Sequence, residues 1–173
     1  KDLTIKPRLF DNNKFLLQNE YRQKTKKSLS IVDFGLVKGH DSSVNDKGGS
    51  RSHIFTNTLV DLSLTDFKSS MLKVNYQKAS NDNYLKIFNL DSPILPTNSN
   101  TLESIIELDL EHEGYDFTTS LEMYETLSGF NSDRYQYVLP SYNFSKNFYL
   151  ENIVGSFNFN SYGNNTLRDT NIS

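Results

Sequence analysis

The chain has 173 residues, of which 36% are hydrophobic, with a mean hydropathy of −0.57 and a formal net charge of −3. It has no cysteine, which excludes disulfides, thiolate chemistry and cysteine-based metal sites. No window approaches the roughly 18 apolar residues of a transmembrane helix. The scattered Lys and Arg of an acidic chain also argue against a nucleic-acid partner, which would need a basic stripe.

Aromatic residues exclude a disordered chain, because 12 Phe and 10 Tyr are spread along it. Aromatic and β-branched side chains fit a pleated, half-buried surface better than a helix. Low mean hydropathy with many aromatics is typical of strands in which every second residue faces an apolar medium and its neighbours face water.

Period-2 alternation recurs along the chain and predicts strands, because successive side chains of a strand point to opposite faces. Early in the chain, Phe15, Leu17 and Tyr21 alternate with polar residues. The best helix candidate, around 84–88, is a single turn at most. In chain order the predicted strands are 3–10, 15–24, 28–37, 52–64, 67–79, 102–112, 115–125, 135–145 and 149–160.

The clearest alternation lies in the segment 101–125, where carboxylates and apolar side chains separate onto two faces. We predict that one face, formed by Leu72, Val74, Ile106, Leu108, Leu110, Phe117 and Leu121, contacts lipid. We predict that the opposite face, formed by Lys73, Asn75, Glu107, Asp109, Glu111 and Glu122, lines a water-filled lumen.

The connections between the predicted strands alternate in length. Tight turns are expected near 25–27, 65–66, 113–114 and 146–148, and Gly114 fits such a turn. Longer polar loops are expected at 38–51, 80–101 and 126–134; the short connection at 11–13 departs from the pattern. Transmembrane barrels have this asymmetry, with short periplasmic turns and longer extracellular loops. Pro140 predicts a bulge, an edge or a strand end.

These patterns predict an all-β fold: an antiparallel up-and-down meander of about nine strands, forming a segment of a large transmembrane β-barrel. Residues 1–173 form a single segment of the barrel domain, and we expect both termini to be cuts in a longer chain. Aromatics near strand ends suit the interfacial girdles of such a barrel. These are Phe10, Tyr21, Tyr124, Tyr135, Tyr137 and Tyr149.

Catalytic and metal-binding interpretations are weaker. Glu107, Asp109 and Glu111 could serve glycoside hydrolysis, but barrel lumens are lined with such charges. We expect these acids to pair instead with basic residues of neighbouring strands, such as Lys73. His40, His53 and His112 show no ligand spacing, and the loops 41–49 and 81–83 do not repeat a calcium-loop pattern. We therefore expect no enzyme activity, no metal and no cofactor.

Three segments together resemble the lipopolysaccharide-assembly outer-membrane protein family, also called the organic solvent tolerance protein. They occur in the family's order and rough spacing and span about residues 2–145. The first is Asp2-Leu3-Thr4-Ile5-Lys6-Pro7-Arg8, followed by Leu16-Leu17 and Glu20-Tyr21-Arg22. The second is Val74-Asn75-Tyr76, leading into Ser80-Asn81-Asp82-Asn83-Tyr84-Leu85-Lys86-Ile87-Phe88. The third is Tyr124-Glu125-Thr126-Leu127, then Tyr135 and Leu139-Pro140.

The resemblance implies a 26-stranded barrel in the outer membrane of a Gram-negative bacterium, which acts as a scaffold and lumen wall for lipopolysaccharide assembly. It implies a plug lipoprotein in the lumen, lipopolysaccharide as cargo, and a periplasmic transport bridge that engages a jelly-roll domain outside this chain. The family's lateral gate, where the first and last strands meet, would also lie outside it. The matching segments read as strand and loop determinants, so no functional residue is carried over.

Two other functions fit the same alternation. The first is another outer-membrane barrel, such as a porin or a receptor channel. The second is a soluble β-sandwich, such as a carbohydrate-binding module, whose apolar faces would pack on each other.

Overall fold

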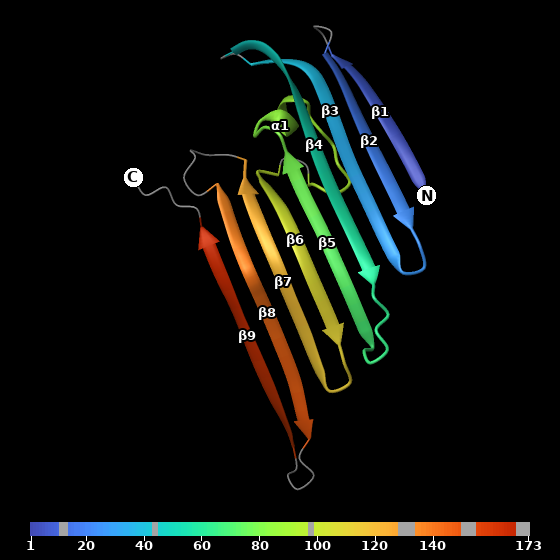
Figure 1. The fold of residues 1–173 in the computed structure, drawn as a ribbon, viewed down its shortest axis with the longest axis vertical. Coiled ribbons are helices and arrows are strands. Elements are labelled where there is room, and N and C mark those ends of the chain that lie inside the picture. The colour runs from blue at the N-terminus through green and yellow to red at the C-terminus, as the bar shows by residue number, and fades with distance from the viewer. Residues whose placement is uncertain (11–13, 43–44, 97–98, 128–133, 150–154, 169–173) are drawn as a thin grey trace.

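A computed structural model describes residues 1–10, 14–42, 45–96, 99–127, 134–149 and 155–168. In these residues the chain forms one antiparallel sheet of nine strands in sequence order, each paired with the next along the chain (Figure 1). The strands are β1 (Asp2–Phe10), β2 (Lys14–Lys24), β3 (Ser28–Ser42), β4 (Asn45–Asp61), β5 (Ser69–Ala79), β6 (Thr101–Glu111), β7 (Tyr115–Thr126), β8 (Tyr135–Tyr149) and β9 (Ser156–Arg168). The predicted all-β, up-and-down fold is confirmed.

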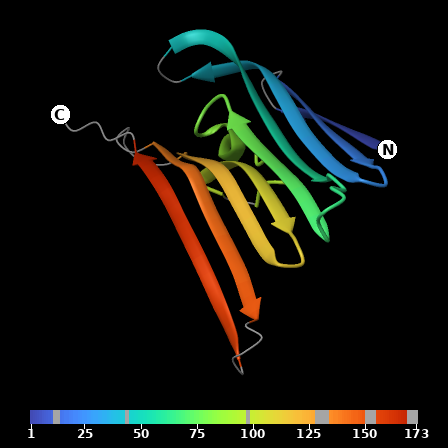
Figure 2. The same cartoon turned by 60° about the horizontal axis from the view of Figure 1, so that its bottom comes forward.

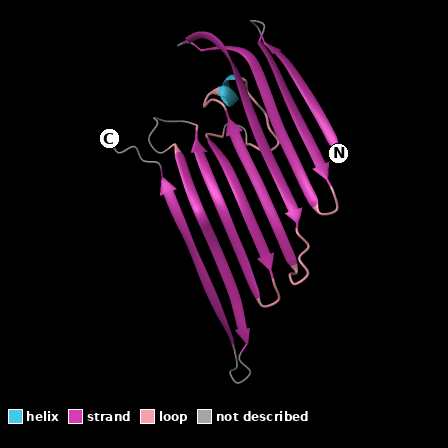
Figure 3. Cartoon of the chain, viewed as in Figure 1, coloured by secondary structure: helices cyan, strands magenta, loops and turns pink. Residues whose placement is uncertain are grey.

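The single helix of the described residues, α1 (Tyr84–Ile87), has four residues and lies in the long connection from β5 to β6. This agrees with the single turn that the sequence predicts there. Figure 3 shows how strand dominates the rest of the chain. In Figure 2 the sheet is curved, and the segment that carries α1 lies beside it rather than extending away from its end.

Two predicted connections are wrong. The segment 38–51 is not a long polar loop: β3 and β4 pair through Val37↔Arg51, His40↔Gly49 and Ser42↔Asn45, with irregularities in the register. Gly and Asp have low strand propensity, but pairing between the two strands overrides it despite the irregular register. The tight turn at 146–148 is also wrong, because β8 continues to Tyr149 and β9 begins at Ser156. The alternation Lys146, Asn147, Phe148 simply continues the strand.

The first of these corrections weakens the evidence from loop lengths. With 38–51 in strand, the connection between β5 and β6 is the one predicted long loop that lies mostly within the described residues. The connection between β4 and β5 is also longer than predicted, since β4 ends at Asp61 and β5 begins at Ser69. The predicted connection at 11–13, and most of the one at 126–134, lie outside the described residues. The distribution of side chains over the two faces therefore becomes the stronger indicator of function.

Pro140 marks a bulge in β8, as the sequence predicts. β7 pairs with β8 at Ser120↔Ser141 and next at Glu122↔Val138, so β8 contains one extra residue there. The β8–β9 register shifts at the same place, between Val138 and Ser141. Proline cannot donate a ladder hydrogen bond, which explains its position at a bulge.

Candidate functional site: two faces of one sheet

The cross-strand register assigns every paired residue to one of two faces, because residues opposite each other point the same way. Across β5, β6 and β7, Val74 lies opposite Ile106, which lies opposite Leu121. In the next row, Lys73 lies opposite Glu107, which lies opposite Ser120. We call the side that contains Val74 the apolar face and the side that contains Lys73 the polar face.

The apolar face exposes large hydrophobic side chains on most of its strands. Ile106 is 50% exposed and Leu121 is 45% exposed, although both lie in the middle of the sheet. Further exposed members of this face are Leu3, Ile5, Leu9, Phe15, Phe34, Leu36, Ile54, Tyr76, Tyr142, Phe148, Phe157, Phe159 and Leu167. Such a continuous apolar surface is far larger than scattered exposed hydrophobics and indicates an apolar partner.

Among the described residues, charged side chains of the apolar face lie toward strand ends. They are Lys38, Lys78, Glu125 and Lys146. One neutral polar side chain, Asn19, lies in the middle of β2 on this face, where it is buried opposite Ile5 and Phe34. The central band of the apolar face therefore has no exposed charge on the described strands.

The polar face holds most of the charged and amide side chains of the described strands, together with some apolar ones such as the exposed Leu29 and Leu59. Lys73 faces Glu107 in the register, and their Nζ and Oε1 atoms are 3.8 Å apart, so the predicted cross-strand ion pair is confirmed. The Thr118 hydroxyl donates to Asp109 at 2.9 Å. Buried members of this face include Gln18, Glu20, Asp33, His53 and Gln77.

The predicted face groupings follow the register. Leu72, Val74, Ile106, Leu108, Leu110, Phe117 and Leu121 share the apolar face. Lys73, Asn75, Glu107, Asp109, Glu111 and Glu122 share the polar face. Which face meets lipid and which lines a lumen stays a prediction. For the aromatic girdle, which stays a prediction, Tyr21, Tyr135 and Tyr137 are on the apolar face, whereas Phe10, Tyr124 and Tyr149 are on the polar face and do not share a face with them.

The segment 80–100 folds back over the polar face of β1–β5. Phe88 packs edge-on against Phe10, with ring centroids 5.3 Å apart. The side chain of Arg8 donates to the carbonyl of Asn89 at 3.1 Å, and that of Gln18 to the carbonyl of Asp91 at 2.9 Å. Apolar residues of this face, Leu16, Val37 and Phe55, form a buried cluster with Tyr84, Leu85 and Phe88. The segment is therefore held against the sheet by packing and by side-chain hydrogen bonds.

A buried polar cluster forms the centre of this attachment. Asp33 and Gln18 are fully buried, and His53 and Tyr84 nearly so. The Nε2 atom of His53 lies 3.4 Å from Asp33 Oδ1, and its Nδ1 lies 3.2 Å from the Tyr84 hydroxyl. Because a carboxylate only accepts, His53 Nε2 is the donor to Asp33, while His53 Nδ1 and the Tyr84 hydroxyl share the second hydrogen bond. Gln18 donates to both oxygens of Asp33 at 3.1 Å.

Gly35 makes this cluster possible. A Cβ atom at position 35 would lie 2.5 Å from Cε1 of His53 and 3.2 Å from the Tyr84 hydroxyl oxygen. Burial raises the pKa of Tyr84 above its ordinary range, and the negative charge of Asp33 adds to this effect. The Tyr84 hydroxyl therefore stays protonated in the folded chain.

Sequence reasoning did not identify this cluster. His53 looked like an isolated histidine, because its partners are 20 and 31 residues away. Asp33 gave the one available signal, as a charge within the otherwise apolar run Ile31-Val32-Asp33-Phe34. Of the other histidines, His112 stacks on Tyr115 with centroids 4.6 Å apart, and the side chain of His40 lies outside the described residues.

A second charged cluster lies at the end of β5 and β7, where Lys78 and Glu125 of the apolar face meet Asp82 and Arg134 from the connections. The carboxylate of Glu125, only 1% exposed, accepts from Lys78 at 2.7 Å and from Arg134 at 2.6 Å. Arg134 also donates to both oxygens of Asp82, at 2.6 and 3.0 Å. The hydrogen bond to Glu125 raises the pKa of Arg134 more than burial lowers it, and Asp82 adds to the rise. We call Lys78, Asp82, Glu125, Arg134 and Tyr135 the rim cluster.

In the described part of the chain, no group of three or more His, Cys, Asp or Glu side chains is arranged to hold a metal ion. Of the described helices, none is long and apolar enough to cross a membrane. No protein-family model matches the chain, and no curated protein matches it.

Proposed function

We propose that this chain forms part of the wall of an outer-membrane β-barrel, with its apolar face on lipid and its polar face lining the lumen. The single observation that carries this proposal is the inverted distribution of side chains. On the polar face of β2–β5, charged and amide side chains such as Gln18, Glu20, Asp33 and Gln77 are buried, while Leu, Ile and Phe are exposed on the apolar face. A protein surrounded by water normally has the reverse arrangement.

Strand length and charge placement support the same proposal. The described strands have 9 to 17 residues, and a membrane strand needs about 9–11. β7 presents an apolar face from Tyr115 to Met123, and the first charge on that face is Glu125. Backbone hydrogen bonds within a closed barrel satisfy all polar main-chain groups in lipid. Among the described strands, β1 and β9 have no outer partner in the sheet, and in a barrel they would pair with further strands.

The membrane placement is tested by refolding this chain with and without detergent, followed by circular dichroism and sedimentation. We expect a strand-rich spectrum in detergent and aggregation in buffer, because two open edges and an apolar face are then exposed. A monomeric, cooperatively unfolding protein in plain buffer would refute the proposal and favour the soluble β-sandwich.

A finer proposal concerns the role of the barrel. We propose that it belongs to the lipopolysaccharide-assembly translocon, where the chain would act as scaffold and lumen wall. The three segments that resemble this family support the assignment, and the fold agrees with it. The segment 80–100 already covers much of the polar face of β1–β5. The acidic part of this face on β6 and β7 is therefore the surface that we propose for the plug lipoprotein.

Site-specific cross-linking tests this assignment. A photo-cross-linking residue at Asp109, on the polar face, should capture a co-expressed plug lipoprotein of this translocon, whereas one at Ile106, on the apolar face, should not. Equal capture at both positions, or none at Asp109, would remove the translocon assignment but would leave the barrel proposal standing.

A further inference from the structure

The ladder between β5 and β6 ends early. Their pairing stops at Asn75↔Ile105, although β5 continues to Ala79 and β6 begins at Thr101. Beyond that point, side chains replace ladder hydrogen bonds. Gln77 accepts from the Glu103 backbone N–H at 2.9 Å, its own N–H donates to the Ser104 hydroxyl at 3.1 Å, and Asn75 donates to the Glu103 carbonyl at 3.1 Å. The sheet is therefore opened along this seam.

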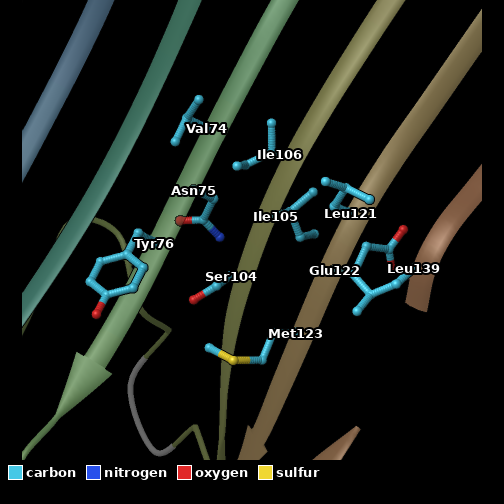
Figure 4. A pocket seen from close by; sticks show the side chains of 10 residues that line it. All are labelled: Val74, Asn75, Tyr76, Ser104, Ile105, Ile106, Leu121, Glu122, Met123 and Leu139. Carbon is cyan, nitrogen blue, oxygen red and sulfur yellow. The ribbon is translucent and has the colours of Figure 1, made fainter. Parts of the chain in front are cut away.

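The apolar face is hollowed at the same place. A groove of about 230 Å³ lies over the seam; its lining is mostly apolar and also includes the polar residues Asn75, Ser104 and Glu122. Figure 4 shows Val74, Ile106 and Leu121 across three strands, with Tyr76, Ser104 and Met123 further along them. Leu139, at the β8 bulge, lines the groove from the neighbouring strand.

The groove leads toward the rim cluster. On the apolar face of β5, Tyr76 and then Lys78 follow Val74. On β7, Met123 and then Glu125 follow Leu121. Four residues of strand cover about 13 Å, given a rise of about 3.3 Å per residue. The apolar groove and the basic side chains of the rim cluster thus share one face and one direction.

The basic side chains of the rim cluster retain capacity to bind an anion. Lys78 is 40% exposed and Arg134 is 30% exposed, whereas the Glu125 carboxylate lies beneath them at 1%; Asp82, the other carboxylate paired with Arg134, is 38% exposed. Lys78 uses two of its three donors, on Glu125 and Tyr135. Arg134 uses four of its five, on Glu125 and Asp82. Within the described residues, each cation therefore keeps one N–H without a protein acceptor.

We infer that this groove and the rim cluster together form a binding site for one anionic, phosphate-bearing lipid. Its acyl chain lies in the groove between Val74 and Met123, and its phosphate meets Lys78 and Arg134. The inference rests on the proposed membrane placement, because it requires the apolar face to be in contact with lipid. An apolar groove that ends in exposed Lys and Arg matches the two ends of such a molecule.

Brominated-lipid quenching tests the site, since the chain has no tryptophan and a single one can be introduced. Tyr76→Trp places the reporter in the groove, and we call it the groove tryptophan. Ile5→Trp provides the control tryptophan, because Ile5 is 57% exposed on the apolar face of β1, where its neighbours on that face are Leu3, Pro7 and Asn19. Each variant is reconstituted in mixed vesicles of phosphatidylcholine and phosphatidylglycerol, in which one of the two competing lipids is brominated.

At the groove tryptophan we expect phosphatidylglycerol to bind about fivefold more tightly than phosphatidylcholine. This ratio corresponds to the attraction of about one basic residue to an anionic lipid. The control tryptophan should show no preference. Lys78→Gln, added to Tyr76→Trp, should abolish the preference at the groove tryptophan, and Lys78→Arg should retain it. Circular dichroism of both Lys78 variants checks that they fold.

The possible failures are distinguishable. Equal quenching of the groove tryptophan by the two lipids overturns the site but leaves the chain in the bilayer. An equal preference at the groove and control tryptophans also overturns it, because the attraction would then be non-specific. Absence of quenching at both positions refutes the membrane placement itself, and the lipid site with it.

Discussion

The attachment of the segment 80–100 to the polar face depends on Gly35, and Gly35→Ala tests this directly. The new methyl group would lie 2.5 Å from Cε1 and 3.0 Å from Nδ1 of His53. Those atoms belong to a buried ring, 4.7 Å from the ring centroid of Phe55, so the ring cannot move aside freely. His53 must therefore shift away from Asp33 or from Tyr84.

The magnitude follows from two effects. Overpacking a filled interior costs about 1–3 kcal/mol, and leaving a buried polar group without its hydrogen bond costs about 1–3 kcal/mol. Because the shift of His53 relieves part of the overlap while breaking the hydrogen bond, we expect a loss of about 2–4 kcal/mol in the free energy of unfolding. Gly114→Ala is the matched control, since its Cβ would meet nothing closer than 3.7 Å and its backbone is not left-handed.

Two assays measure the effect on the chain folded in detergent micelles. Denaturant unfolding gives the stability, and tryptic cleavage after Lys86, an exposed residue of α1, reports release of the segment. A double-mutant cycle with His53→Ala isolates the cause: without the His53 ring, Gly35→Ala should cost less than about 1 kcal/mol. Unchanged stability and unchanged cleavage at Lys86 in Gly35→Ala would refute the proposed role of the cluster, as would a full effect in the His53→Ala background.

Three further predictions concern the clusters and faces of the sheet. First, folding raises the pKa of Tyr84 above its ordinary value of 10.0, so the contribution of Tyr84 to stability is complete below pH 10 and declines as the pH rises beyond it. Above pH 10 the wild-type chain should therefore lose up to about 1.4 kcal/mol of unfolding free energy per pH unit relative to Tyr84→Phe. Unfolding at pH 9 and pH 11 measures this, and a parallel response of the two chains would contradict it. Second, Glu125→Gln removes the buried partner of Lys78 and Arg134 and should lower the free energy of unfolding by about 1–2 kcal/mol, less than for a fully buried pair because both cations are partly exposed. The control Glu107→Gln breaks a half-exposed pair and should cost less than about 1 kcal/mol in the same denaturant titration. Equal costs would show that the burial of Glu125 is unimportant. Third, Ile106→Arg on the apolar face should lower the free energy of unfolding in lipid vesicles by about 2–4 kcal/mol. Thr118→Arg on the polar face, beside Asp109, should leave it nearly unchanged. The reverse order would invert the assignment of the two faces.

The sequence by itself determined the fold class, the number of strands and the grouping of side chains on two faces. The alternation of Glu107, Asp109 and Glu111 with Ile106, Leu108 and Leu110 is a local property, because successive side chains of a strand point to opposite faces of the sheet. The same locality made Pro140 a usable signal for the bulge in β8. Propensity failed where strand pairing outweighed it, as in the β3–β4 hairpin.

The tertiary structure alone decided where the segment 80–100 lies and which polar groups it meets. Arg8 and Asn89 are 81 residues apart in the chain, and Gln18 and Asp91 are 73 apart. No local periodicity encodes such contacts, because they depend on which strands become neighbours and in which register. The same reason applies to the β5–β6 seam. In the sequence Asn75 and Gln77 look like ordinary strand residues, and only the position of β6 beside them shows that their side chains form hydrogen bonds in place of the backbone ladder.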